Sequence, residues 1–178
     1  LMRLKDNSKI RIGENATTTI EFCEYKPDGS QKSGIFVAVG DVICNIKKVA
    51  GRTNAFDVRT PTAVASIRGT IFEARVNANG ATDFGVLEGT IAVGKAGERG
   101  RVAVGANQKA TVNRTSNVVA AEAMPPAERK RIVETAKSVT SKEEHAALTA
   151  QTPSKDESKE EKAEDGEEEE ADEEEAEA

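Results

Sequence analysis

The chain of 178 residues is long enough for one domain of ordinary size and too short for two well-packed ones. Apolar residues make up 37% of it and aromatic residues 3%, with no Trp, so the core must be built from small aliphatic side chains. The net charge of −6 is uneven: residues 154–178 hold fifteen acidic residues and three Lys, whereas residues 1–153 hold 22 Lys and Arg against 16 Asp and Glu. These basic residues lack the interleaved aromatic side chains typical of nucleic-acid binding, so no nucleic-acid partner is expected.

The start of the chain shows no targeting or membrane segment. The longest clean apolar run covers only residues 35–39, far short of the roughly 18 residues that a spanning helix needs, so no membrane span is predicted. No signal peptide is recognisable. Leu1 already lies within a strand pattern, which favours a processed or truncated start.

Up to about residue 113 the sequence predicts an all-β domain of short antiparallel strands, arranged as a sandwich, a barrel or a β-solenoid. Alternating segments are separated by Gly, Asn and Asp turns every eight to twelve residues. The clearest hairpin joins 70–76 to 82–87. We expect local strand pairing, because no crossover helix is available for a parallel sheet. Further strands are predicted over 9–12, 35–39, 42–47, 55–60, 90–93, 101–104 and 108–113.

Two short helices are predicted after the β region. Pro125 and Pro126 precede a segment whose apolar residues Ile132, Val133 and Ala136 form a narrow stripe, which favours a docking helix. A second, weaker helix is predicted to run toward residue 148. Its start matches a capping box of either Thr140 with Glu143 or Ser141 with Glu144.

The predicted domain organisation is a β domain over residues 1–118, a helical extension over 119–150 and a disordered acidic tail over 151–178. The tail contains no apolar side chain large enough to offset the entropy cost of ordering. We expect it chiefly to raise solubility. Contact with a basic partner, or with the chain's own basic β domain, is the alternative.

The sequence lacks the residue groups that catalysis or metal binding needs. His145, the only histidine, lies in the polar helical extension, and no His, Cys and carboxylate group has ligand spacing. The glycine-rich run over 94–101 is followed by a strand rather than a helix, which favours a hairpin turn over a phosphate loop. No enzyme activity, cofactor or metal is therefore expected. Cys23 and Cys44 lie on different predicted strands and form either one disulfide or two separate, half-buried thiols.

One stretch of the sequence has a recognisable signature. Residues 56–74 run through Thr60-Pro61, then small and apolar residues, then Arg68-Gly69-Thr70 with an aromatic residue two places on, and they resemble the signature of the FecR domain family. The opening over 4–16, a Leu-Glu-Gly turn and a closing Gly-Gln strand follow the family's order. The matching positions are Thr60, Pro61, Arg68, Gly69, Thr70, Glu88, Gly89, Gly105 and Gln108.

Most of these positions have a backbone role that can be inferred without the family. Pro61 forces Thr60 into an extended conformation and removes a hydrogen-bond donor, so it belongs at a strand start or a sheet edge. Gly69 permits a bend before the strand at Thr70, and Arg68 could bond to carbonyl groups at that corner. We therefore expect the signature to be architectural.

The resemblance implies a function class and a location. In the family that the chain resembles, the domain occurs in two kinds of protein. Some are periplasmic regulators of iron-uptake sigma factors, which relay a signal from a TonB-dependent receptor, and others are further envelope proteins. We expect a non-catalytic, periplasmic or cell-envelope module that binds another envelope protein or a wall polymer. The alternative is the sensory part of a sigma-factor regulator, although the amino-terminal helical region, membrane span and STN-like domain of such regulators are missing. A carbohydrate-binding protein is disfavoured, because few aromatic side chains could stack on sugars. The oligomeric state is not predicted.

Overall fold

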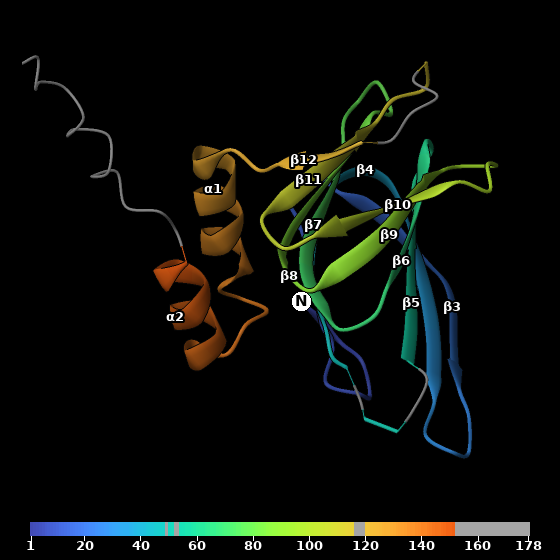
Figure 1. The fold of residues 1–178 in the computed structure, drawn as a ribbon. Coiled ribbons are helices and arrows are strands. Elements are labelled where there is room, and N and C mark those ends of the chain that lie inside the picture. The colour runs from blue at the N-terminus through green and yellow to red at the C-terminus, as the bar shows by residue number, and fades with distance from the viewer. Residues whose placement is uncertain (49, 52–53, 116–119, 152–178) are drawn as a thin grey trace, which may run out of the picture.

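In the computed structural model, residues 1–48, 50–51, 54–115 and 120–151 are described. They form a β-sandwich with two helices on one side (Figure 1). The strands are β1 Met2–Arg3, β2 Lys9–Ile12, β3 Thr17–Tyr25, β4 Gln31–Ile46, β5 Asn54–Arg59, β6 Ala63–Ile67, β7 Thr70–Val76, β8 Thr82–Glu88, β9 Thr90–Lys95, β10 Arg101–Gly105, β11 Gln108–Val112 and β12 Ala121–Ala123. The helices are α1 Pro126–Ala136 and α2 Lys142–Ala150.

The strands form two layers that share β4. One layer, here the helix-covered sheet, has the order β1-β2-β4-β7-β8-β11-β12. The other, here the open sheet, has the order β3-β4-β5-β6-β9-β10. The predicted all-β class is confirmed, and through β4 the two layers join into one nearly closed sheet.

The core lies between the two sheets and is built from small aliphatic side chains with few aromatic ones. Inward residues alternate with outward ones along each strand, as period-two side chains must. Core residues that are at most 1% exposed come from both sheets and include Ile10, Ile35, Val37, Val58, Phe72, Phe84, Val86, Ile91 and Val93.

The longest strand corrects one part of the prediction. Residues 35–39 and 42–47 were expected to be separate strands with a turn at Gly40, but β4 runs continuously and bends there. Gly40 has a φ of +92°, a conformation that side chains with a Cβ rarely adopt, and a Cβ on it would lie 2.5 Å from the Cα of Ala16. This glycine therefore carries the chain from the open sheet into the helix-covered sheet.

The expectation of local, antiparallel pairing is wrong for several strands. β4 pairs with β7, β6 pairs with β9, and β4 and β5 are parallel. Because β4 is bent in the middle, its two ends lie at the same end of the sandwich. The short connection after Ile46 can therefore return the chain to Gln31, where β5 pairs in parallel without a crossover helix.

The two helices cover the outer face of the helix-covered sheet, as the predicted docking helix requires. Ile43, Ile71 and Leu87 on the strands form a second apolar cluster with α1, α2 and the residues beside them. Space for α1 comes from Gly85, where a Cβ would lie 2.7 Å from the Cδ1 of Ile132. The helix members of the cluster are Met124, Ile132, Val133, Ala136, Val139 and Leu148.

The start of α2 is fixed by the Ser141–Glu144 capping box, one of the two alternatives in the sequence. The Glu144 amide donates to the Ser141 hydroxyl at 3.2 Å, and the Ser141 amide donates to the Glu144 carboxylate at 2.7 Å. Burial alone would raise the pKa of Glu144, but its bonds with Lys47 and Ser141 lower it below the ordinary value. The stability that these contacts contribute is therefore lost as the pH falls through that lowered pKa.

Removing the cap gives a first test of the fold. Ser141→Ala should lower the free energy of unfolding by about 1 kcal/mol, because an amide of the first helical turn loses its partner. Urea unfolding followed by circular dichroism measures this change. Ser138→Ala is the matched control, since the exposed Ser138 hydroxyl only donates to the Thr135 carbonyl, and it should change stability by less than about 0.5 kcal/mol. Equal effects of both changes would contradict the capping role.

Candidate protein-interaction site

The Thr60-Pro61 part of the signature forms the turn between β5 and β6. The Thr60 hydroxyl accepts a bond from the Ala63 amide at 2.9 Å, which closes the turn. A buried set of three threonine hydroxyls then joins this turn to the β7–β8 hairpin: Thr82 lies 2.8 Å from both Thr60 and Thr62. Pro61 itself is exposed, where a missing backbone donor costs nothing.

Two glycines of the signature lie at adjacent corners where the chain passes between sheets. Gly69 separates β6 from β7 and Gly89 separates β8 from β9, with φ angles of +69° and +84°. A Cβ on Gly89 would lie 2.6 Å from the carbonyl oxygen of Gly69, so the two corners touch through their backbones. The hydroxyl of Thr70 donates to the Thr90 carbonyl at 3.2 Å and links the strands that leave them.

The Gly-Gln pair forms the corner between β10 and β11. The Gln108 side chain accepts from the Gly105 amide at 2.8 Å. Between them, Asn107 has a φ of +61°, and its side-chain oxygen accepts from the Arg129 guanidinium of α1 at 2.7 Å. The resemblance did not single out Asn107, although an Asn in a glycine-rich turn is the signal that could have found it.

Arg68 and Glu88 are the signature residues with exposed charges. Arg68 makes no hydrogen bond or ion pair with any residue that the structure describes, so the expected bonds to corner carbonyls are not present. The corners therefore rest on glycine backbone and threonine hydroxyls. The architectural role of the signature as a whole stays a prediction.

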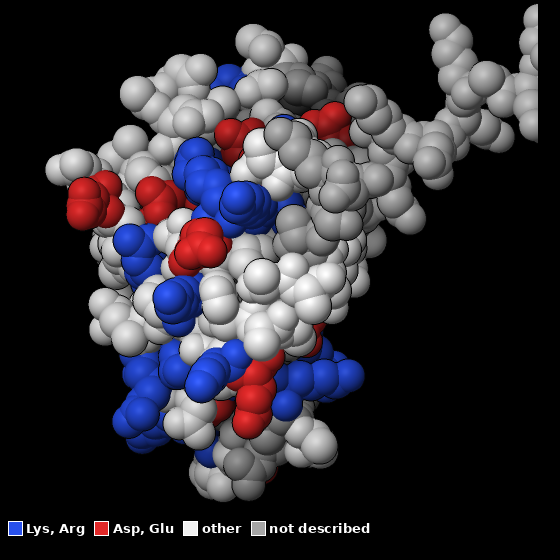
Figure 2. Space-filling model, turned by 90° about the vertical axis from the view of Figure 1, so that its left-hand side faces the viewer, with Lys and Arg blue, Asp and Glu red and all other residues white. Residues whose placement is uncertain are grey.

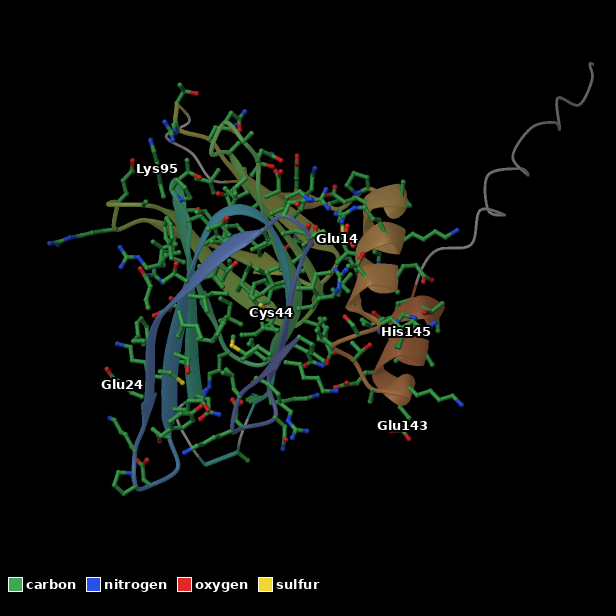
Figure 3. All side chains as sticks on the ribbon, turned by 180° about the vertical axis from the view of Figure 1, so that it is seen from behind. Glu14, Glu24, Cys44, Lys95, Glu143 and His145 are labelled. Carbon is green, nitrogen blue, oxygen red and sulfur yellow. The ribbon has the colours of Figure 1, made fainter. Side chains whose placement is uncertain are left out.

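The two cysteines are free thiols, which corrects the possibility of a disulfide. Cys23 on β3 pairs with Ser33, and Cys44 lies eleven residues further along β4. Because β4 bends at Gly40, Ser33 and its neighbour Cys23 belong to the open sheet and Cys44 belongs to the helix-covered sheet. Packed sheets lie about 10 Å apart, whereas bridged cysteines have Cα atoms about 4.4–6.8 Å apart. Cys23 is exposed and Cys44 is completely buried, so neither thiol is half-buried. Figure 3 shows Cys44 in the interior of the β domain.

These environments predict two different reactivities. Burial raises the pKa of Cys44 far above its ordinary value, and the thiolate is the reactive form. A thiol reagent such as Ellman's reagent should therefore modify Cys23 alone in the native protein and both cysteines in denaturant. Cys23→Ser should leave no thiol that reacts quickly in the native state. Rapid native modification of this variant would contradict the buried position of Cys44.

The titratable side chains labelled in Figure 3 lie on different sides of the molecule. His145 is half-buried on α2, on the opposite side of the molecule from Glu24 on β3 (Figure 3). In the described part of the chain, no group of three or more His, Cys, Asp and Glu residues is placed to hold a metal ion. Nor does any described helix combine the length and apolarity needed to cross a bilayer.

The most unusual surface is the core-facing side of β3. Ile20 and Tyr25 pair with Ile35 and Gln31, which are buried, so the same side of β3 continues the core face. Ile20 is nevertheless 57% exposed and Tyr25 41% exposed. The open sheet therefore extends one strand beyond the layer that covers it, as the outlying position of β3 in Figure 1 shows.

The backbone of β3 is also open. This nine-residue strand pairs with β4 on one side and with no described strand on the other, so its outward amide and carbonyl groups face solvent. Register shifts occur between Thr17 and Thr18 and between Ile20 and Phe22. Irregularities of this kind discourage indiscriminate edge pairing and leave only short regular stretches for a specific partner.

The C-terminal end of β3, at Tyr25, has a polar environment. The ammonium of Lys5 lies 4.5 Å from the centre of the Tyr25 ring, a cation–π distance. A side-chain hydrogen bond with Cys23 raises the pKa of Tyr25 above its ordinary value, and burial adds to this. Tyr25 therefore presents a neutral hydroxyl beside an apolar ring, a combination common in protein interfaces. We call Ile20, Cys23, Tyr25 and the free backbone edge of β3 the β3 site.

The chain thus forms a small all-β domain. Among its described residues, β3 presents exposed apolar side chains and an unpaired strand edge that another protein could contact. The family model described as FecR protein matches residues 1–92. Because this match covers more than half of the chain, the chain belongs to the FecR family. Gly105 and Gln108 lie beyond the matched part.

Solved structures with the same fold include two crystal structures described as a putative anti-sigma factor from Parabacteroides distasonis ATCC 8503. They share 18% sequence identity with the chain and give TM-scores of 0.57 and 0.56. Each comparison covers 76% of this chain and 59% of the other, so the chain spans about three fifths of the length of those proteins. No curated protein matches the chain.

Proposed function

We propose that this chain is a non-catalytic regulatory module of a sigma-factor system in the bacterial cell envelope, and that it acts by binding another protein through the β3 site. Family membership and the fold shared with a protein described as a putative anti-sigma factor support the regulatory class. The observation that carries the binding mode is the exposure of Ile20 and Tyr25 on the core side of an edge strand.

Strand addition is the recognition mode that this geometry favours. A partner strand beside β3 would satisfy its free backbone groups, and side chains of the partner would cover Ile20 and Tyr25. Burying apolar surface contributes roughly 25 cal/mol per Å², so these two side chains would anchor the contact. A wall polymer lacks the alternating backbone donors and acceptors that such pairing uses, which favours a protein partner.

The proposal also assigns roles to the three parts of the chain. It assigns residues 1–118 to the binding domain, residues 119–150 to the helical extension and residues 151–178 to the acidic tail. The described part of the extension, from residue 120 on, covers one sheet and is joined to it through β12. Except for Gln151, the predicted tail lies outside the described residues. A link to TonB-dependent iron uptake belongs to the same proposal, as the pathway in which FecR-type regulators are expected.

A photo-crosslinking experiment with a transcript readout tests both parts of the proposal. A photoreactive amino acid replaces Ile20 in the full chain in its native host, and Thr19, which is exposed on the other face of β3, is the matched position. We expect a protein adduct from position 20 and none from position 19. We also expect Ile20→Lys, but not Thr19→Lys, to change sigma-factor-dependent transcription at least fivefold.

The outcomes separate the binding site from the regulatory class. Unchanged transcription after deletion of the whole chain would overturn the sigma-factor role. In a second outcome, deletion of the chain changes transcription, and Ile20→Lys and Thr19→Lys change it equally. That result would overturn the β3 site and leave the regulatory role standing. An adduct with a wall polymer in place of a protein would overturn the choice of partner.

A further inference from the structure

A second surface, distinct from the β3 site, lies at the edge of the helix-covered sheet. Met2 and Ile10 pair across β1 and β2 and point into the core. The alternate residues Arg3, Lys9 and Arg11 therefore point outward. This outward face is the one that the helices cover, because Arg11 pairs with Ile43 of the second apolar cluster.

The C-terminal end of α1 extends this group of cations. Arg11 and Lys137 line one shallow hollow together with Glu134, Thr135 and Ser138. We call Arg3, Lys9, Arg11 and Lys137 the basic strip. Figure 2 views the molecule from the helix side and shows Lys and Arg gathered in groups with fewer acidic side chains among them.

Like charges lie close together in the basic strip. Arg3 is directly opposite Lys9 in the antiparallel register, and Lys9 and Arg11 are neighbours on one face of β2. Like charges directly opposite each other destabilise a sheet. None of the four cations has an ion-pair partner in the described parts of the chain, so this cost is not offset there.

Two of the acidic groups on this side are already engaged, whereas Asp41 on β4, whose carboxylate lies beside Gly13, forms no ion pair with a described residue. The Glu73 carboxylate accepts two bonds from Arg131, at 2.7 and 2.6 Å. Glu144 is paired with Lys47. Glu134 is the one acidic residue that lines the hollow beside Arg11, and it is exposed. The basic strip therefore keeps an excess of positive charge that an anionic partner can neutralise.

We propose that the occupant of the basic strip is the chain's own C-terminal segment, residues 154–178. This segment contains fifteen Asp and Glu against three Lys, a net charge of −12, and the strip belongs to a part of the chain with a net charge of +6. The segment follows α2, which packs against α1, and the hollow beside Arg11 lies at the C-terminal end of α1. Its 25 residues could span roughly 80 Å if extended, so reach does not limit the contact.

Attachment to the same chain strengthens a contact of this kind. A tethered segment has an effective concentration on the order of millimolar, so weak ion pairs suffice to keep it bound part of the time. The contact depends on salt, because the Debye length falls from about 30 Å at about 0.01 M to about 3 Å at about 1 M. The docked segment would cover the outward face of β1 and β2, whereas β3 belongs to the other sheet and meets this hairpin where Lys5 lies over the Tyr25 ring.

Paramagnetic relaxation enhancement in the full-length chain tests this proposal. A nitroxide is attached to a cysteine at position 171 (Ala171→Cys) in a Cys23→Ser background, and buried Cys44 stays unlabelled. At low salt the amide signals of residues 3, 9 and 11 should lose at least half of their intensity. They should recover near 1 M salt.

Two sets of substitutions make the test specific. Arg3→Ser with Lys9→Ser and Arg11→Ser should abolish the signal loss. Lys26→Ser with Arg68→Ser and Arg99→Ser, which removes three exposed cations elsewhere, should preserve it. Glu167, Glu168, Glu169 and Glu170, all changed to Gln, should weaken the loss while the described residues stay unaltered.

Each other outcome would overturn the proposal. Signal loss centred on other residues, or loss that persists in the triple variant of the strip, would show that the segment does not dock there. Mixing spin-labelled chains with isotope-labelled, unlabelled chains distinguishes a second copy as the partner. If the signal loss appears only between chains, the C-terminal segment docks on a second copy in a dimer, and the intrachain contact is wrong.

Discussion

Replacing Gly89 with Ala is expected to lower the free energy of unfolding by about 2–4 kcal/mol. Gly89 has a φ of +84°, and a Cβ there would lie 2.6 Å from the Gly69 carbonyl oxygen and 2.9 Å from the Thr70 hydroxyl. The change therefore adds a steric clash to backbone strain. Since backbone atoms of the neighbouring corner cannot move without disturbing β7, the clash cannot be relieved locally. Urea unfolding, followed by circular dichroism, measures the loss.

Gly97→Ala provides a matched control for this experiment. Gly97 has nearly the same φ, +82°, but no atom lies within 4 Å of the Cβ that it would gain. This variant should lose only the strain contribution, about 1–2 kcal/mol. Equal losses at Gly89 and Gly97 would show that the corners do not depend on close backbone approach.

The sequence was sufficient to predict most strands and turns, although not β1, β6 and β12, and it did not show which turns are corners. Gly80 closes a hairpin within one sheet, whereas Gly89 carries the chain between sheets, and both follow an alternating strand. The difference depends on which strand lies beside each turn, and local patterns carry no information about distant neighbours. The same limit explains why the bend of β4 at Gly40 was predicted as a turn between two strands.

The candidate sites could not be predicted from the sequence alone, for a similar reason. The alternation around Ile20 marks β3 as a strand, but its exposure depends on how far the opposite sheet extends. The basic strip depends on the register of β1 against β2, which places Arg3 opposite Lys9. By contrast, the helix that begins at Pro126 was predictable because its proline start and apolar stripe are both local.

Replacing Arg131 with Met should produce the second large loss of stability, about 2–3 kcal/mol. Arg131 on α1 donates two bonds to Glu73 on β7, whose side chain is 4% exposed. These bonds raise the pKa of Arg131 above its ordinary value. Removing one partner of a buried pair typically costs about 3–5 kcal/mol, and the 36% exposure of the Arg131 side chain reduces the expected loss. Thermal and urea unfolding both measure it.

A double substitution distinguishes the loss of a helix contact from the burial of a carboxylate that lacks its bidentate partner. If the cause is that buried Glu73 loses its bidentate partner and keeps only the longer contact with Arg75, Glu73→Leu combined with Arg131→Met should restore stability to within about 1 kcal/mol of the original protein. Arg75 lies 3.4 Å from the same carboxylate but donates no bidentate pair, so Arg75→Met should cost clearly less than Arg131→Met. A double variant as unstable as Arg131→Met would instead mean that the arginine stem packs α1 against the sheet, because only that contact stays lost when the buried charge is gone.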